Sequence, residues 1–74
     1  MKNKKRYTVL SEQNIKNLDE VVVVQRFSYY FASDSRGMAD SIAASLKRIN
    51  HAYRILDKDT VVEEWTHEGF HASN

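Results

Sequence analysis

Residues 20–33 of the chain read EVVVVQRFSYYFAS. Apolar and aromatic side chains fill almost every odd position of this segment, whereas the even positions become mixed after Val24. A period of two in β-branched and aromatic residues is typical of a β-strand with one buried face. The segment therefore predicts a long strand whose odd positions, which include Phe27, Tyr29 and Phe31, face a core.

The segment that follows predicts a helix over residues 35–50. Residues 33–35 read SDS, a cluster of residue types that cap the start of a helix. Asn50 is a residue type that takes the left-handed conformation in which helices end. Between these ends apolar side chains recur at helical spacing, and we expect them to pack on the odd face of the preceding strand. They are Met38, Ile42, Leu46 and Ile49, and Ala39 and Ala43 widen this stripe.

Shorter strands are predicted on both sides of this strand and helix, over residues 7–10, 53–56 and 61–65. The polar stretch 11–20 predicts a loop or a single helical turn, and residues 57–60 predict a turn. The chain ends, residues 1–6 and 66–74, are expected to be flexible. The sequence thus predicts one α+β domain over residues 1–74, in which one helix covers one face of an antiparallel sheet of three or four strands.

An all-α helical hairpin is the alternative fold. One heptad register accommodates Ala39, Ile42, Leu46, Ile49, Tyr53 and Leu56, so that the helix would continue to Asp57. Its partner would be a helix over residues 11–32. That helix would be apolar on all sides, because it contains four consecutive valines and the aromatic run 27–31. A chain of 74 residues has too small a core to bury every side of one helix.

The order of the central elements resembles the strand–helix–strand half of ferredoxin-like regulatory domains. The residues that carry this resemblance are YYFASD at 29–34, the alanine-rich helix at 39–46 and AYRI at 52–55. Unrelated families share the pattern. The resemblance therefore implies an arrangement of elements and no particular activity.

Composition excludes several classes of protein. The chain has no cysteine, so it holds no disulfide, and its longest apolar run, 21–24, is far shorter than a membrane helix. No signal peptide is recognisable, and we expect a cytoplasmic protein. The net charge is only +1, yet residues 1–10 carry four positive charges and residues 55–74 a surplus of four negative charges.

Motifs for catalysis are weak. Residues 67–71 spell H-E-x-x-H, which binds zinc when it lies on a helix. Gly69 disfavours that helix, and the three residues after His71 supply no third ligand. We therefore expect no metal site, with His67 and His71 as the only weak candidates for one. No serine lies in a nucleophile elbow, and two glycines are too few for a phosphate loop. The sequence predicts neither an enzyme nor a cofactor.

The predicted function is that of a small, non-enzymatic protein-binding regulator or inhibitor. Segregated charge suits a protein partner with a polarised surface, and a half-covered sheet leaves an apolar face for it. Homodimerisation would also relieve the small core. Inhibitors of host systems encoded by phages or mobile elements, anti-CRISPR proteins among them, are similar to this chain in size and in their lack of motifs. The residues expected to bind the partner are Arg26, Tyr30, Val22, Val24 and Trp65.

A nucleic-acid-binding module is the alternative function. Arg26 and Tyr30 on an open sheet face would stack with bases, and basic side chains would contact phosphates. The small net charge disfavours this function, because nucleic-acid-binding domains are usually strongly basic. The candidate phosphate contacts are Lys4, Lys5, Arg6, Arg36, Lys47 and Arg48.

Overall fold

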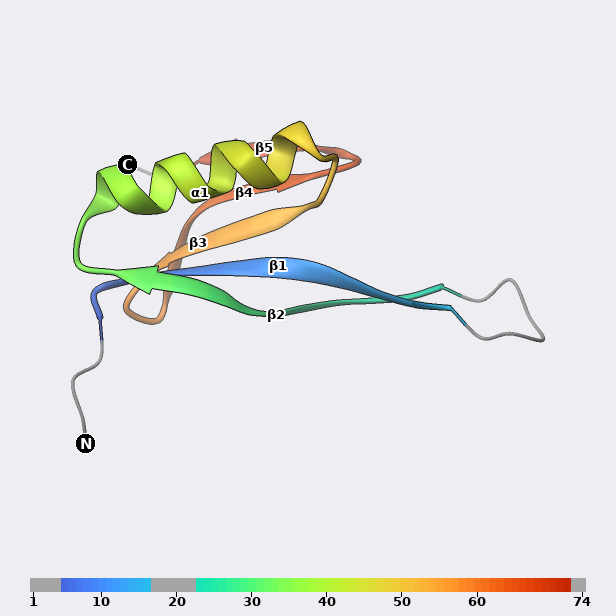
Figure 1. The fold of residues 1–74 in the computed structure, drawn as a ribbon, viewed down its shortest axis with the longest axis horizontal. Helices are drawn as coiled ribbons and strands as arrows, with labels where there is room; N and C mark the ends of the chain where they lie inside the picture. Colours follow the sequence, from blue (N-terminus) through green and yellow to red (C-terminus); the bar gives the residue numbers. More distant parts are fainter. Residues whose placement is uncertain (1–4, 17–22, 73–74) are drawn as a thin grey trace.

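The computed structural model describes residues 5–16 and 23–72, which form one helix on one sheet (Figure 1). The elements are β1 (Tyr7–Lys16), β2 (Val23–Ser33), α1 (Arg36–Arg48), β3 (Tyr53–Asp57), β4 (Thr60–Thr66) and β5 (Gly69–Ala72). All neighbouring strands are antiparallel, in the order β2-β1-β3-β4-β5. The predicted α+β class, with one helix on an antiparallel sheet, is confirmed, and the helical hairpin is excluded.

The sheet has five strands where the sequence predicted three or four. β1 continues through the polar residues 11–16, for which a loop or helical turn was expected, because these residues pair with β2 along a long hairpin. β5 lies within residues 66–74, where a flexible tail was predicted, and it forms a hairpin with β4. Both segments are held as strands by backbone pairing, and neither shows the apolar alternation by which a sequence predicts a strand.

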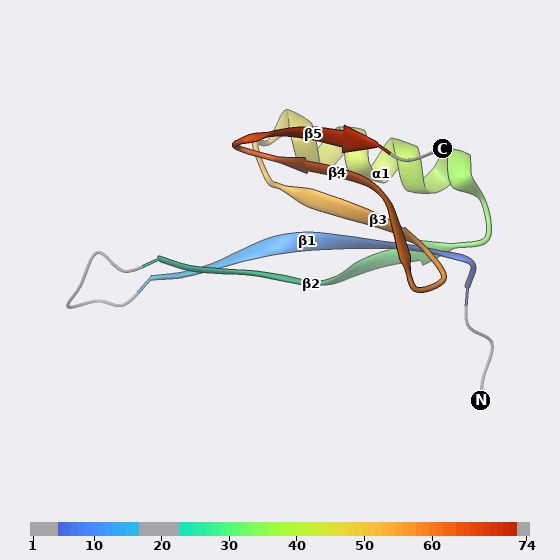
Figure 2. The same cartoon turned by 180° about the vertical axis from the view of Figure 1, so that it is seen from behind.

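Helix α1 connects two strands that are parallel to each other. β2 and β3 both pair with β1 in the antiparallel sense, so β1 lies between them. This strand–helix–strand arrangement agrees with the resemblance seen in the sequence. Figures 1 and 2 show α1 on one face of the sheet, and the other face carries none of the described elements. No helix among residues 5–16 and 23–72 is long and apolar enough to cross a membrane.

The core lies between α1 and the three strands β1, β2 and β3. Its largest fully buried side chains are Val9, Leu46 and Ile55, and Tyr7, Phe31, Ile42, Val62 and Trp65 pack around it. As predicted, the helix is capped at its start, where the Ser35 hydroxyl accepts a hydrogen bond from the Met38 amide at 3.3 Å. It also ends as predicted, since Asn50 has a φ of 65°.

The face that α1 buries differs from the predicted one. Its fully buried residues are Ala39, Ala43 and Leu46, whereas Met38 and Ile49 are 51% and 59% exposed. Small alanine side chains let the helix approach the sheet closely, and this turns the larger Met38 and Ile49 to one side. The prediction that both pack on the strand is therefore wrong.

A β-bulge in β2 reverses the faces of its aromatic residues. Val9 pairs with Phe31, but the next residue of β1, Leu10, pairs with Tyr29, which leaves Tyr30 as an extra residue. Phe31 therefore shares the α1 face with Val9, whereas Tyr29 shares the opposite face with Leu10. Phe27, two residues earlier, also lies on the opposite face. The predicted core face is thus correct for Phe31 and wrong for Phe27 and Tyr29.

Arg6, directly before β1, makes a two-pronged contact with Asp57. Arg6 Nε and Nη2 donate to the two carboxylate oxygens at 3.0 and 3.1 Å, and the Arg6 carbonyl accepts from the Lys58 amide at 2.7 Å. These contacts attach residue 6 to the β3–β4 turn.

The hydrogen bond from Arg6 lowers the pKa of the Asp57 carboxyl below its usual value. Since this pKa is lower in the folded than in the unfolded chain, the contact favours folding above the unfolded pKa and is lost as the pH falls through the folded one. We expect Arg6→Gln to return the Asp57 pKa toward its usual value, measured from the carboxyl ¹³C shift in an NMR titration. An unchanged Asp57 pKa in this variant would contradict the assignment.

Candidate protein interface

The sheet face away from α1 has an uncovered row of side chains across all five strands. Strand register places Tyr29 of β2, Leu10 of β1, Arg54 of β3, Glu64 of β4 and His71 of β5 side by side. Tyr29 is 69% exposed, more than any other large hydrophobic side chain in the described part of the chain. We call this surface the open face.

Two further apolar side chains extend the open face along the strands. Leu56 of β3 pairs with Val61 of β4 and with Thr8 of β1, so these three residues form a second row next to the first. Val61 is exposed and Leu56 is half-buried. The face therefore presents apolar area on hydrogen-bonded strands, which hold the backbone of these residues in fixed positions.

The positive charge of Arg54, at the centre of the open face, already has partners within the protein. Arg54 Nε donates to Glu64 Oε2 at 2.7 Å, and the guanidinium lies 4.0 Å from the centroid of the Phe27 ring. A charge-assisted hydrogen bond and a cation–π contact thus hold the same side chain. A partner can cover Arg54 without leaving an unpaired buried charge, which is the costly case for ionic groups at interfaces.

The two histidines of the H-E-x-x-H segment lie at the edge of the open face. They line a depression of about 460 Å³ together with Phe27, Arg54 and Glu64. His67 Nε2 is 3.2 Å from Oε2 of Glu12, whose side chain is buried, and this contact ties the β4–β5 turn to β1. The segment forms a hairpin, not a helix, and the described residues contain no group of three or more His, Asp or Glu arranged to hold a metal ion.

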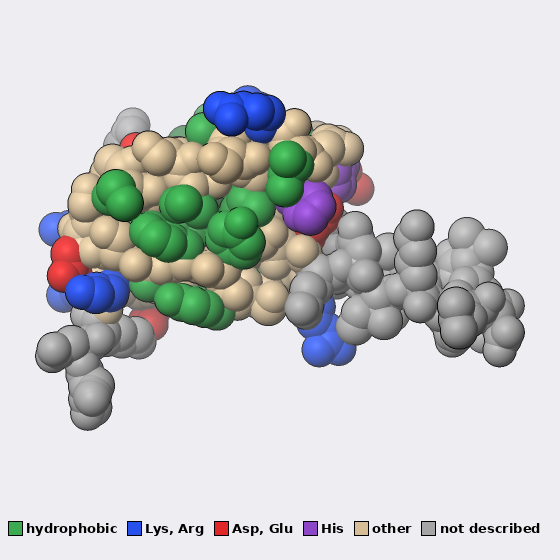
Figure 3. All heavy atoms as spheres, in the orientation of Figure 1, with side chains coloured by type: hydrophobic (Ala, Val, Ile, Leu, Met, Phe, Trp, Pro, Cys, Tyr) green, Lys and Arg blue, Asp and Glu red, His purple; other side chains and the backbone are tan. Residues whose placement is uncertain are grey.

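A second exposed apolar surface lies on the α1 side, along the outer edge of β2. At 100° per residue, Met38, Ile42 and Ile49 share one flank of the helix. The other flank faces β4, because Arg36 contacts Glu63 and Lys47 lies over the Trp65 ring. Figure 3 shows hydrophobic side chains gathered between α1 and β2. We call this surface, together with the half-exposed Tyr30 of β2, the edge strip.

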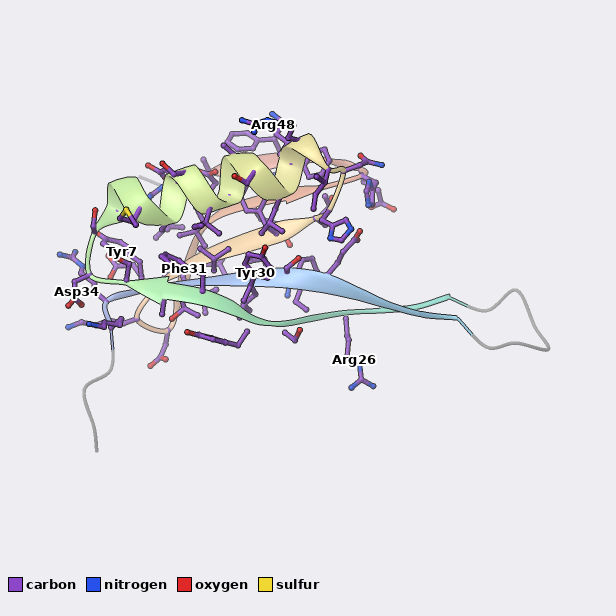
Figure 4. The ribbon with its side chains drawn as sticks, viewed as in Figure 1. Tyr7, Arg26, Tyr30, Phe31, Asp34 and Arg48 are labelled. Atoms are coloured by element: carbon purple, nitrogen blue, oxygen red, sulfur yellow. The ribbon has the colours of Figure 1, made fainter. Side chains whose placement is uncertain are left out.

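Two of the partner-binding residues predicted from the sequence, Arg26 and Tyr30, lie exposed along the outer edge of β2. Arg26 points outward from this edge and Tyr30 lies nearer to α1 (Figure 4). Val22 lies outside the described residues, and of Val24 only the backbone, within β2, is described.

Trp65, the fifth predicted residue, packs against the core on β4. Its ring stacks on Tyr53 with centroids 6.4 Å apart, and Lys47 Nζ lies 5.9 Å above it. Trp65 is therefore at the far flank of α1 from Tyr30, and it contributes to the edge of the core.

The cations of the nucleic-acid alternative are mostly paired with carboxylates or with aromatic rings. Lys5 pairs with Asp34, Arg6 with Asp57, and Arg36 with both Asp40 and Glu63. Lys47 lies over Trp65, and Lys4 is outside the described residues. Among the described residues of this set, only Arg48, at the top of α1 in Figure 4, has neither a carboxylate nor an aromatic ring as a partner. These residues do not form one basic surface.

The sequence does not indicate that Tyr29, Met38 and Ile49 are exposed. All three belong to apolar patterns that normally indicate a core. A bulge has no reliable signal in the local sequence, and which flank of α1 is buried depends on the alanines beside it.

Comparisons of the chain with protein-family models, curated proteins and solved structures gave no match.

Proposed function

We propose that the protein is a small, non-enzymatic protein-binding regulator or inhibitor that binds its partner with the open face. The observation that carries this proposal is Tyr29, 69% exposed on a sheet face that no described element covers. Tyrosine is among the residue types most enriched at interface hot spots. Contiguous exposed apolar area on a small domain marks an interaction site more often than scattered single residues do.

The geometry of the open face favours a protein partner. Its apolar residues lie on hydrogen-bonded strands, so little side-chain or backbone freedom is lost when a partner covers them. Arg54 and Glu64 already neutralise each other, which leaves no surplus charge to attract a polyanion. The pairing of most other cations lends little support to the nucleic-acid alternative. We expect a partner with a largely apolar contact surface.

The test is capture of a partner from bacterial lysate, followed by a binding measurement with that partner purified. We expect Tyr29→Ala to weaken binding by about thirtyfold, which corresponds to about 2 kcal/mol, the size of a hot-spot loss. Isothermal titration calorimetry measures the change, and circular dichroism checks that the variant is folded.

The matched control is Phe70→Ala. Phe70 is 53% exposed on β5 and pairs with Trp65, so it lies on the other face of the sheet. This variant should bind as tightly as the wild type. Equal losses in both variants, or no stoichiometric partner at all, would rule out the open face as the binding surface.

A further inference from the structure

We infer that a second copy of the chain docks along the outer edge of β2, with the two β2 strands antiparallel and the two edge strips in contact. Among the described strands, β2 lies at one end of the sheet and has β1 as its single neighbour. Two adjacent apolar elements border this free edge, the exposed flank of α1 and the aromatic residues of β2. The inference concerns a different surface from the open face and does not depend on the proposed function.

The residues of the edge strip are arranged so that a two-fold axis brings matching apolar side chains together. In Figure 4, Tyr30 and Phe31 lie below the middle of α1, so one axis can pass near both elements. Met38 and Ile49 lie on the same flank of the helix, one on each side of its centre. A two-fold rotation therefore places Met38 of each copy near Ile49 of the other and brings the two Tyr30 side chains together at the axis.

Charge complementarity selects the second copy as the occupant. Arg26 and Asp34 are each four residues from Tyr30, on opposite sides of it. No carboxylate within residues 5–16 and 23–72 pairs with Arg26. The Asp34 side chain is 71% exposed; it lies 3.8 Å from Lys5 Nζ and accepts a hydrogen bond from the Arg6 amide at 2.9 Å. An exposed ion pair of this length contributes little. Rotation about Tyr30 places Arg26 of each copy beside Asp34 of the other, which makes two equivalent contacts.

The bulge and the two charges also restrict which strands can pair with this edge. A bulge interrupts the regular spacing of backbone groups, and charged side chains on an edge disfavour indiscriminate pairing. A partner strand that runs antiparallel must then carry an acidic residue opposite Arg26 and a basic residue opposite Asp34. A second copy of β2 meets this requirement. Strands with another arrangement of charges would place like charges opposite Arg26 or Asp34, and this repulsion disfavours their binding.

The test is a charge exchange followed by analytical ultracentrifugation over a range of protein concentrations. The wild type should dimerise. Arg26→Asp and Asp34→Arg each place like charges opposite one another at both contacts, and each single variant should dimerise at least tenfold more weakly. An equimolar mixture of the two variants pairs opposite charges at both contacts, so it should form a heterodimer. The double variant should dimerise like the wild type.

If dimerisation is restored in the mixture, the single variants had lost an interface contact and not their fold, because two misfolded chains do not repair each other. Glu68→Lys, in the β4–β5 turn, is the charge control and should leave dimerisation unchanged. A wild type that stays monomeric, or single variants that fail to recover on mixing, would overturn the inference. Neither outcome bears on partner capture by Tyr29, since that residue lies on the open face.

Discussion

Ile55→Ala should lower the free energy of unfolding by about 2–5 kcal/mol, the range for truncating a fully buried aliphatic side chain. Ile55 has no exposed surface, and it lies in β3 between its cross-strand neighbours Val9 and Glu63. A domain of 74 residues has a total stability of roughly 4–11 kcal/mol, at about 0.05–0.15 kcal/mol per residue. This one change should therefore leave a large fraction of the protein unfolded at moderate temperature.

Ile49→Ala removes the same atoms from a position that is 59% exposed, and it is the matched control for Ile55→Ala. Its effect on stability should stay within about 0.5 kcal/mol. Urea unfolding, followed by circular dichroism at low protein concentration, compares the two variants without a contribution from association. Losses of equal size would mean that Ile55 is not the centre of the core.

The parts of the fold that were predicted correctly are those with local physical signals. The serine cap, the 3.6-residue period and Asn50 define α1 within two residues at each end. The strands 53–57 and 60–66 were predicted because β-forming residues stand on both sides of a polar turn. Each of these signals acts over a few neighbouring residues, so a single sequence contains it.

The parts that were predicted incorrectly depend on contacts between distant segments. The polar second half of β1 is a strand because β2 lies beside it, and β5 is a strand because β4 offers it an edge. The bulge at Tyr30 moves Tyr29 to the open face, although the alternation of residues 20–33 is otherwise regular. Backbone pairing is non-local, so periodicity along the chain does not report it.

The two proposed surfaces are compatible with each other. A two-fold axis that relates antiparallel neighbours in one sheet is perpendicular to that sheet, so both helices lie on one side and both open faces on the other. Dimerisation through β2 thus joins the two open faces into one wider surface. A partner with two-fold symmetry would then bind through two copies of Tyr29, which raises its apparent affinity without any new contact.

Glu63→Ala should cost about 1.5–3 kcal/mol of stability, the range for hydrogen bonds to a charged group. The Tyr53 hydroxyl donates to Glu63 Oε2 at 2.6 Å, and Arg36 Nη2 donates to Oε1 at 3.3 Å. The carboxylate therefore connects α1, β3 and β4 at the border of the core. Removing it leaves the hydroxyl of a buried tyrosine without its acceptor.

Glu63→Gln is the control, because an amide retains an acceptor for Tyr53 and loses only the charge. Burial, followed by the hydrogen bond to Glu63, raises the pKa of the Tyr53 hydroxyl well above its usual value. Since the folded pKa exceeds the unfolded one, this contribution is complete below the unfolded tyrosine pKa of about 10 and is lost as the pH rises toward the folded value. Urea unfolding at neutral pH should rank stability as wild type, then Glu63→Gln, then Glu63→Ala. If the Gln variant is as unstable as the Ala variant, the charge and not the hydrogen bond to Tyr53 stabilises this part of the fold.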